Sequence, residues 1–243
     1  MDTFKLLSRV LGFETSLYKY GDSAIDELEV KLQSGHRLDA VFTEFPGNPL
    51  LQSPNLDRLH ALSRKYGFLL VVDGTVGAYA NVNLLPLCDI ICASHTKMFS
   101  GACNVMGGSV VVSPSSPFYA DMRAALHVFH RPEQWFPEDV LVMEKNSRDY
   151  VERVHRASAN AEAVAELLRR DPVVDEVYYP KGSPSQHIYD RYKLPNGGYG
   201  FLLSVRFTSS KKAEAFYDAL DTAKGPSFGT NFTLTCKCIF NAS

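Results

Sequence analysis

Apolar residues recur at helical spacing in two stretches near the start of the chain, residues 22–35 and 53–67. The residues expected to face a core are Ile25, Leu28, Leu32, Leu56, Leu59 and Leu62. In the second stretch, Ser53 is the expected N-cap and Pro54 the first helical residue, and Gly67 is expected to end the helix. Both stretches therefore predict amphipathic helices.

Nearly continuous apolar runs predict strands between and after these helices. They occupy residues 68–75, 89–96 and 107–113, and residues 39–45 are also expected to form a strand. Such runs are typical of strands covered on both faces, as in a parallel sheet. The strand–helix–strand order from residue 39 to 75 predicts a right-handed crossover and an α/β layered core.

The pattern changes after residue 136. Residues 136–171 are mostly of helical type, and Pro172 is expected to end that segment. Strand-like runs at 173–180 and 200–207 and a helical run at 211–220 follow. We therefore predict a mostly parallel sheet flanked by helices in residues 1–150, and a long connecting helix with a partial, smaller α+β region in 151–243.

Composition narrows the classes of partner, compartment and site that are expected for this chain. The chain has 243 residues, 45% of them hydrophobic, and a formal net charge of -2, which does not favour nucleic acid or an anionic membrane as a partner. No apolar run approaches the roughly 20 residues of a membrane span. Five cysteines without a small-domain disulfide pattern favour a reducing compartment, the cytoplasm. Cys236 and Cys238 are one residue apart and miss the usual zinc spacing, so no metal site is expected.

Unusual polar residues follow three of the predicted strands. They are Glu44 and Asn48 at the end of the first, Asp73 and Thr75 at the end of the second, and Ser94, Thr96 and Lys97 at the end of the third. Open α/β sheets bind ligands outside the carboxyl ends of their strands, so these side chains are expected to share one edge.

Each of these polar residues also has an ordinary structural explanation. Asn48 before a proline suits a turn, Asp73 suits a cap, and Lys97 can extend its amine to solvent. Their recurrence at one place in the predicted sheet favours a binding site instead. His95 is expected to point away from Ser94 and Thr96 by strand alternation and to serve packing.

One cofactor uses all of these groups. A lysine amine forms Schiff bases with carbonyls, and pyridoxal 5'-phosphate carries an aldehyde, a phosphate and a pyridine nitrogen. An aspartate commonly holds the pyridine nitrogen, and hydroxyl groups can donate to phosphate oxygens. The residue types after the three strands therefore predict a pyridoxal-phosphate site without a metal.

The motifs that carry these residues resemble those of the Cys/Met-metabolism family of pyridoxal-phosphate enzymes. The matching stretches are "TEFPGNPLLQSPNLDRL", "VVDGTVG", "ASHTKMFSGACNVMGGSVV" and, more loosely, "KGPSFGTNFTL". Within the family, "EFPGNPLL", "NVMGGS" and "MEKNSRD" are most similar to fungal cystathionine γ-synthases. The resemblance implies a fold-type-I pyridoxal-phosphate-dependent transferase.

The resemblance also implies a role for each site residue. Lys97 is the Schiff-base lysine and moves the substrate's protons, and Asp73 holds the pyridine nitrogen. Ser94 and Thr96 hold the phosphate, while Asn48 and Thr75 lie against the ring oxygen and the ring. Ser227 lies near the lysine and the substrate carboxylate, and Glu44 is a further candidate for substrate binding.

The implied reaction is a γ-replacement on an activated homoserine ester. For a fungal protein the ester is O-acetyl-L-homoserine, and cysteine as the nucleophile gives cystathionine in transsulfuration and methionine biosynthesis. Related nucleophiles in fungal secondary metabolism, and cystathionine β- or γ-lyase activity, remain open because all these enzymes share the cofactor motifs. The resemblance further implies a homodimer or homotetramer, and aromatic residues around Trp135 could line a subunit contact.

The chain departs from the family at both ends. Family members have an N-terminal part with a glycine-containing phosphate turn, a ring-stacking aromatic residue, and Tyr and Arg for the neighbouring subunit's phosphate. They also have a C-terminal Arg for the substrate carboxylate, whereas no Arg follows Arg206 here. The alternative hypothesis is therefore a truncated, catalytically impaired remnant or isoform that pairs with a full-length copy.

A serine hydrolase is the rival outside this family. Ser94 and Lys97 fit the S-x-x-K pattern of penicillin-binding proteins and β-lactamases. That class also requires S-D-N and K-T-G elements, and neither occurs in the sequence. The pattern therefore gives this class little support.

Overall fold

A computed structural model describes residues 2–12, 14–18 and 21–237, without side-chain detail for residues 2–5 and 7. Its helices are α1 (Asp2–Leu11), α2 (Asp22–Gln33), α3 (Leu56–Tyr66), α4 (Tyr119–Phe129), α5 (Pro137–Ser147), α6 (Tyr150–Leu168), α7 (Gln186–Tyr192) and α8 (Ser210–Ala219). Its strands are β1 (Ala40–Glu44), β2 (Leu69–Asp73), β3 (Ile90–Ser94), β4 (Gly108–Val112), β5 (Val174–Tyr178), β6 (Ser204–Phe207), β7 (Ala223–Lys224) and β8 (Leu234–Thr235). Short helical turns cover Leu85–Leu87, His95–Phe99 and Pro132–Gln134.

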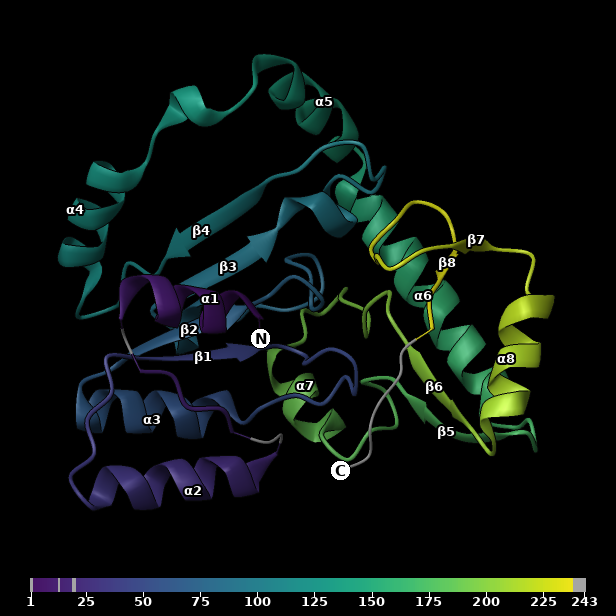
Figure 1. Cartoon of the computed structure of the whole chain (residues 1–243), viewed down its shortest axis with the longest axis horizontal. Coiled ribbons are helices and arrows are strands. Elements are labelled where there is room, and N and C mark those ends of the chain that lie inside the picture. The colour runs from purple at the N-terminus through teal and green to yellow at the C-terminus, as the bar shows by residue number, and fades with distance from the viewer. Residues whose placement is uncertain (1, 13, 19–20, 238–243) are drawn as a thin grey trace.

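The main sheet has the order β1-β2-β3-β4 (Figure 1). Strands β1, β2 and β3 are parallel, as the apolar runs predict, whereas β4 is antiparallel to β3. The sheet is therefore mixed. The prediction that residues 107–113 form a strand covered on both faces is wrong, because this segment returns beside β3 at the edge of the sheet. Val110 and Val111 on β4 are accordingly 49% and 37% exposed.

The main core lies between the sheet and helices α2 and α3 (Figure 1). Both helices bury the apolar faces that their spacing predicts, and Gly67 ends α3 in the left-handed conformation, with φ 76°. The expected start of α3 is wrong. Asn55 is the N-cap and accepts a hydrogen bond from the Arg58 N–H (3.2 Å), while the Ser53 N–H donates to the Ser185 hydroxyl (2.8 Å).

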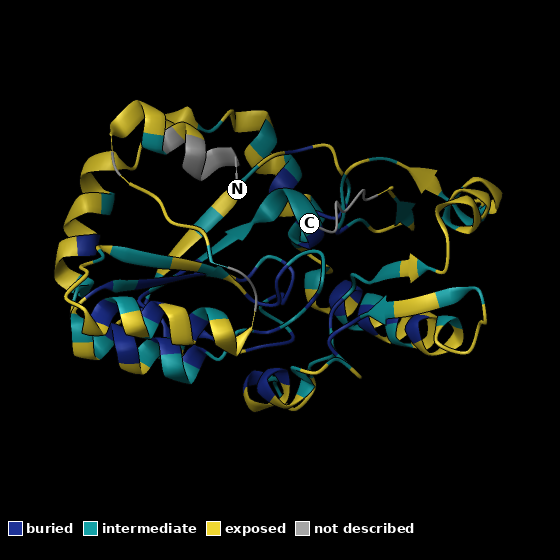
Figure 2. Cartoon of the chain, turned by 60° about the horizontal axis from the view of Figure 1, so that its bottom comes forward, coloured by how far each residue is buried: buried dark blue, intermediate teal, exposed yellow. Residues whose placement is uncertain are grey.

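The segment from α4 to α5 arches beyond the edge strand β4 (Figure 1). Most of its residues are exposed, whereas buried residues gather in β2, in helices α2 and α3 and in the loops that follow β1 and β2 (Figure 2). Residues 136–171 are mostly helical, as expected, and they form two separate helices, α5 and α6, with a break between Ser147 and Tyr150.

The chain beyond α6 forms a two-stranded antiparallel sheet of β5 and β6, next to α8 (Figure 1). Helix α7, which the apolar pattern did not predict, packs back into the main core through Ile188, Tyr189 and Tyr192. The rings of Tyr189 and Phe45 stack with their centroids 5.6 Å apart. The 151–243 region is thus connected to the first core by aromatic packing.

A buried carboxylate joins β2 and β3 at the end of the sheet away from the polar clusters. Asp89 has no exposed surface, and its carboxylate accepts hydrogen bonds from Arg64 (2.5 Å), the Ser116 hydroxyl (2.5 Å) and the Leu70 N–H (2.8 Å). A buried charge is stable only when it is paired and hydrogen-bonded, and Asp89 meets both conditions. This network holds the start of β3 in place.

Candidate active site

The carboxyl ends of β2 and β3 bring three of the predicted site residues together. The Asp73 carboxylate accepts a hydrogen bond from the Thr75 N–H (2.9 Å), and the Thr75 hydroxyl accepts one from the Ser94 N–H (2.8 Å). Glu44 is the neighbour of Asp73 in the parallel register of β1 and β2. These residues share one edge because parallel strands end on the same side of a sheet.

Lys97 lies just beyond β3, in the helical turn His95–Phe99. Its backbone interrupts the turn with non-helical angles, φ -85° and ψ -132°. Its amine donates a hydrogen bond to the Ser227 hydroxyl (3.0 Å) and lies 4.5 Å from the centroid of the Phe228 ring. The structure therefore brings together Lys97 and Ser227, which are 130 residues apart in sequence.

The loop that carries Ser227 packs tightly on the Lys97 turn. A Cβ on Gly229 would lie 2.6 Å from the Met98 nitrogen and 2.9 Å from the Lys97 Cβ, so only glycine fits there. Gly229 also has φ 73°, in the left-handed region that favours glycine. In addition, the Asn231 N–H donates to the Gly101 carbonyl (2.7 Å). Backbone contacts thus hold the turn that carries Lys97, and the side chains of Ser227 and Phe228 contact its amine.

The other predicted site residues have local partners. The Thr96 hydroxyl donates to the Gly107 carbonyl (3.4 Å) and accepts from the Gly107 N–H (3.2 Å). The Glu44 carboxylate accepts a hydrogen bond from the Asn48 N–H (2.8 Å). The proposed roles of Thr96 at a phosphate, Asn48 at a ring oxygen and Glu44 at a substrate therefore stay predictions.

His95 is not on a strand, so strand alternation does not decide its direction. The strand β3 ends at Ser94, and His95 begins the turn that holds Lys97. Its ring stacks on Phe99 at 4.1 Å, and its Nε2 lies 2.9 Å from the Ser109 hydroxyl. His95 thus packs against the turn and also joins it to β4, and the second contact was not predicted.

Burial lowers the pKa of His95 below its ordinary value of 6.5. The unfolded chain therefore takes up this proton at a higher pH than the folded chain. We expect the contribution of His95 to stability to be fully present above about pH 7 and to be lost as the pH falls through the ordinary histidine range. Urea midpoints measured between pH 8 and pH 5, by about 0.5-unit steps, test this expectation.

The matched variants for this titration are His95→Asn and, as a control, His36→Asn, because His36 is exposed. The His95→Asn chain is expected to lose less stability on acidification than the parent chain, and His36→Asn is expected to follow the parent. Parallel curves for the parent and His95→Asn would contradict the prediction.

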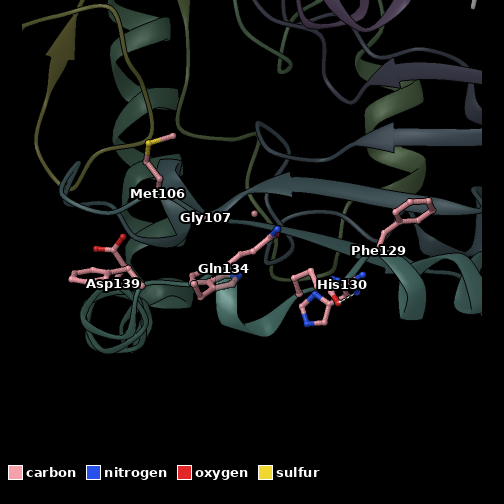
Figure 3. Close-up of a pocket in the computed structure, with 10 residues that line it drawn as sticks. Met106, Gly107, Phe129, His130, Gln134 and Asp139 are labelled. Atoms are coloured by element: carbon pink, nitrogen blue, oxygen red, sulfur yellow. Dashed lines mark hydrogen bonds between the residues drawn. The ribbon is translucent and has the colours of Figure 1, made fainter. Parts of the chain in front are cut away.

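A cavity of about 390 Å³ adjoins this turn through Gly107 (Figure 3). Its lining includes Met106, Phe129, Trp135 and Phe136. Gly107 also connects the cavity to the lysine turn, because its carbonyl accepts hydrogen bonds from the backbone of His95 and Thr96. The cavity therefore lies beside the Lys97 turn, under the aromatic segment that joins α4 to α5.

Two residues at the site were not found from sequence. Phe228, whose ring faces the Lys97 amine, directly follows the predicted Ser227 and could have been found from that position. Arg153 is only 6% exposed, and it directly precedes Val154, a fully buried residue of α6. A cation beside the buried row of an amphipathic helix is the signal from which Arg153 could have been found.

Neither a metal centre nor a membrane span is found in the described part of the chain. No group of three or more His, Cys, Asp or Glu residues there is arranged to hold a metal ion. Within the same residues, no helix is both long and apolar enough to cross a membrane. Cys238, one of the pair considered for a metal, lies outside the described residues.

The α/β fold and the lysine, carboxylate and hydroxyl groups near its strand ends are those expected of a pyridoxal-phosphate enzyme. The chain belongs to the family of Cys/Met metabolism PLP-dependent enzymes, whose signature matches residues 2–237. This confirms the resemblance seen in the motifs.

Individual relatives agree with this assignment. The chain is 49% identical over 97% of its length to cystathionine gamma-synthase of Neurospora crassa, and 42% identical over 92% of its length to the cystathionine gamma-synthase-like protein ankD of Aspergillus thermomutatus. It spans 38% and 40% of the lengths of these two relatives. Cystathionine gamma synthase of Xanthomonas oryzae has a similar structure, with a TM-score of 0.79 at 25% identity over 96% of this chain and 59% of that one.

The residues at the strand ends fit pyridoxal phosphate by chemical type. The half-buried amine of Lys97 suits an aldehyde, and the exposed carboxylate of Asp73 suits a protonated ring nitrogen. The hydroxyls of Ser94 and Ser227 can donate hydrogen bonds to anionic oxygens. The donor set of this edge is therefore compatible with the cofactor that the family uses.

Proposed function

We propose that Lys97 holds pyridoxal phosphate covalently and that the protein serves a γ-replacement on an activated homoserine ester. The observation that carries the proposal is the contact of the Lys97 amine with Ser227 (3.0 Å), beside the linked Asp73, Thr75 and Ser94. The similarity to fungal cystathionine gamma-synthase favours O-acetyl-L-homoserine and cysteine as substrates.

In the overall reaction, the Cγ–O bond of the ester breaks and a Cγ–S bond to cysteine forms. Acetate leaves, and the thiol proton is released, so that atoms and charge balance. The bound cofactor supplies an electron sink for carbanion chemistry at the amino acid. Lys97 then takes and returns the protons of the substrate's Cα and Cβ, which requires its amine to be positioned and neutral.

Each remaining residue has a proposed task. Asp73 keeps the ring nitrogen protonated, and Thr75 orients the Asp73 carboxylate through its N–H. Ser94 and Thr96 donate to the phosphate, and Asn48 donates to the ring oxygen. Ser227 and Glu44 orient the substrate, with Ser227 already hydrogen-bonded to the lysine.

Borohydride trapping tests the covalent step of this proposal. The purified chain is incubated with pyridoxal phosphate, reduced, digested and analysed by mass spectrometry. A stable pyridoxyl group on Lys97 supports the proposal, and its absence from Lys97 overturns it. Labelling spread evenly over exposed lysines would equally count against a built site.

Product analysis separates the possible reactions. The chain with cofactor is supplied with O-acetyl-L-homoserine and cysteine, and in parallel with cystathionine. Formation of cystathionine supports the γ-replacement. Homocysteine or cysteine released from cystathionine would favour the lyase alternatives, and cofactor binding without turnover would favour an impaired remnant.

We also propose that the chain assembles as a homodimer or homotetramer, or with a full-length copy. Several large apolar side chains on and near the α4–α5 segment are exposed: Met106 (77%), Phe129 (78%), Phe136 (60%) and Leu141 (70%). Exposed apolar clusters of this kind mark interaction surfaces. Light scattering over a range of concentrations tests this, and a monomer at every concentration would exclude a homo-oligomer.

The proposed compartment is the cytoplasm. Cys88, Cys92 and Cys103 carry free thiols. Burial raises the pKa of the Cys88 thiol to about 12, so this group stays protonated and unreactive at neutral pH. Free thiols are usual in reducing compartments and support this location.

A further inference from the structure

Arg153 on α6 is a buried cation directly beside the turn that carries Lys97. It is only 6% exposed. A guanidinium is costly to bury unless its donors are hydrogen-bonded and its charge is paired. The partners that make this burial possible therefore show what Arg153 holds together.

Most of these partners belong to the lysine turn. One terminal nitrogen of Arg153 donates to the carbonyls of Met98 (3.1 Å) and Phe99 (2.8 Å). The same nitrogen also lies 3.1 Å from the Asn146 carbonyl at the end of α5. The other terminal nitrogen pairs with the Asp149 carboxylate, one helical turn before Arg153. Arg153 thus connects the α5–α6 junction to the two residues that follow Lys97.

The turn needs such a partner because its backbone is irregular. Lys97 has non-helical angles, and carbonyls at the end of a short helical turn have no following N–H groups to bind. Gly101, two residues after the turn, has φ 75°, and a Cβ there would lie 2.7 Å from the Arg153 Nε. The guanidinium therefore occupies the space beside the turn and binds its carbonyls.

Further contacts join the α5–α6 junction to the segment after Lys97. Asn146 donates hydrogen bonds from its side chain to the Ser100 hydroxyl and to the Asn104 side-chain oxygen, both at 2.9 Å. In addition, the Tyr150 ring packs against Phe99 with centroids 5.1 Å apart. The junction between α5 and α6 thus contacts the segment after Lys97 at several points, with Arg153 the most buried of them.

We propose that Arg153 is a positioning residue that sets the place of the Lys97 amine by holding the Met98 and Phe99 carbonyls. The loop with Ser227 lies against the same backbone, so a shift of Met98 would move the amine relative to its hydroxyl partner. The inference rests on the proposed function only in assigning the cofactor to Lys97.

Three variants separate a positioning role of Arg153 from a purely structural one. Arg153→Lys keeps the positive charge but cannot reproduce the fork of hydrogen bonds. Arg156→Lys is the matched control, because Arg156 lies on the same helix and its side chain is 62% exposed. Asp149→Asn is a milder second variant, since it removes the charge that orients Arg153 and leaves the guanidinium in place.

Amide hydrogen exchange without added cofactor measures the turn itself. The Ser100 N–H donates to the His95 carbonyl (2.9 Å) and the Gly101 N–H to the Lys97 carbonyl (2.8 Å), so both amides report on this turn. In Arg153→Lys we expect them to exchange about tenfold faster than in the control, relative to amides of β2 in the same sample. Asp149→Asn is expected to change in the same direction by less.

Trapping of pyridoxal phosphate at Lys97, followed across pH, measures the consequence for the Lys97 amine. We expect about a tenfold lower yield at Lys97 in Arg153→Lys and a displaced pH midpoint, with the control unchanged. Unchanged exchange and trapping in a folded Arg153→Lys chain would overturn the proposal. If that chain does not fold, Asp149→Asn decides in the same way.

The two proposals can fail separately. Absence of trapping at Lys97 in the parent chain would overturn the proposed function, and the exchange of Ser100 and Gly101 would still decide whether Arg153 holds the turn. Normal trapping in the parent with unaffected variants would leave the function standing and exclude the role of Arg153.

Discussion

Replacing Lys97 with alanine is expected to remove the trapped pyridoxyl label from this position and to lower any turnover of the parent chain by about 10²–10⁴-fold. The loss follows because no other described side chain presents an amine to Ser227 at the ends of β2 and β3. Mass spectrometry after borohydride reduction and product analysis measure the two effects.

Two further variants make this result specific to the amine. Lys65→Ala is the matched control, because Lys65 is exposed near the end of α3. It is expected to keep the parent's labelling at Lys97. Lys97→Arg retains the positive charge but has no amine that can be deprotonated near neutral pH, so it is expected to fail as alanine does. Full labelling elsewhere with turnover intact in Lys97→Ala would reject the assignment.

Replacing Asp89 with alanine is expected to lower the free energy of unfolding by about 3–5 kcal/mol. The change removes the fully buried carboxylate that binds Arg64, Ser116 and the Leu70 N–H. It leaves the guanidinium of Arg64 without its carboxylate partner. Urea denaturation of the parent and the variant measures the loss.

Asp26→Ala serves as the control for this measurement. Asp26 also pairs with an arginine, Arg58, but its side chain is 64% exposed. An exposed ion pair contributes about 0–1 kcal/mol, so the control is expected to lose far less stability. Equal losses of unfolding free energy in the two variants would contradict the expectation that the buried Asp89 carboxylate stabilises the fold more than the exposed Asp26 does.

Local spacing predicted the helices α2 and α3 and the strands β1 to β3, because α2, α3, β2 and β3 bury apolar residues in one core and Val41 of β1 packs partly buried against it. It missed the direction and exposure of β4. An edge strand and a central strand can have the same valine-rich sequence, and only the path of the chain after Lys97 places this one at the edge. It also missed α7, whose aromatic residues pack across the chain into a core far away in sequence. The division of the chain at residue 150 stays a prediction.

The residue types around Lys97 were sufficient to propose the cofactor, and the motifs that carry them were sufficient to identify the family by resemblance. They carry that information because an amine, a carboxylate and hydroxyls at successive strand ends are chemically specific, and a parallel sheet places such ends together. The resemblance placed Ser227 near the lysine, whereas the contacts of Phe228 and Arg153 and the geometry around the amine came only from folding. Ser227, Phe228 and Arg153 reach Lys97 from distant parts of the chain, and no local periodicity encodes their distances, which depend on how the loop after α8 and the helix α6 pack on one irregular turn.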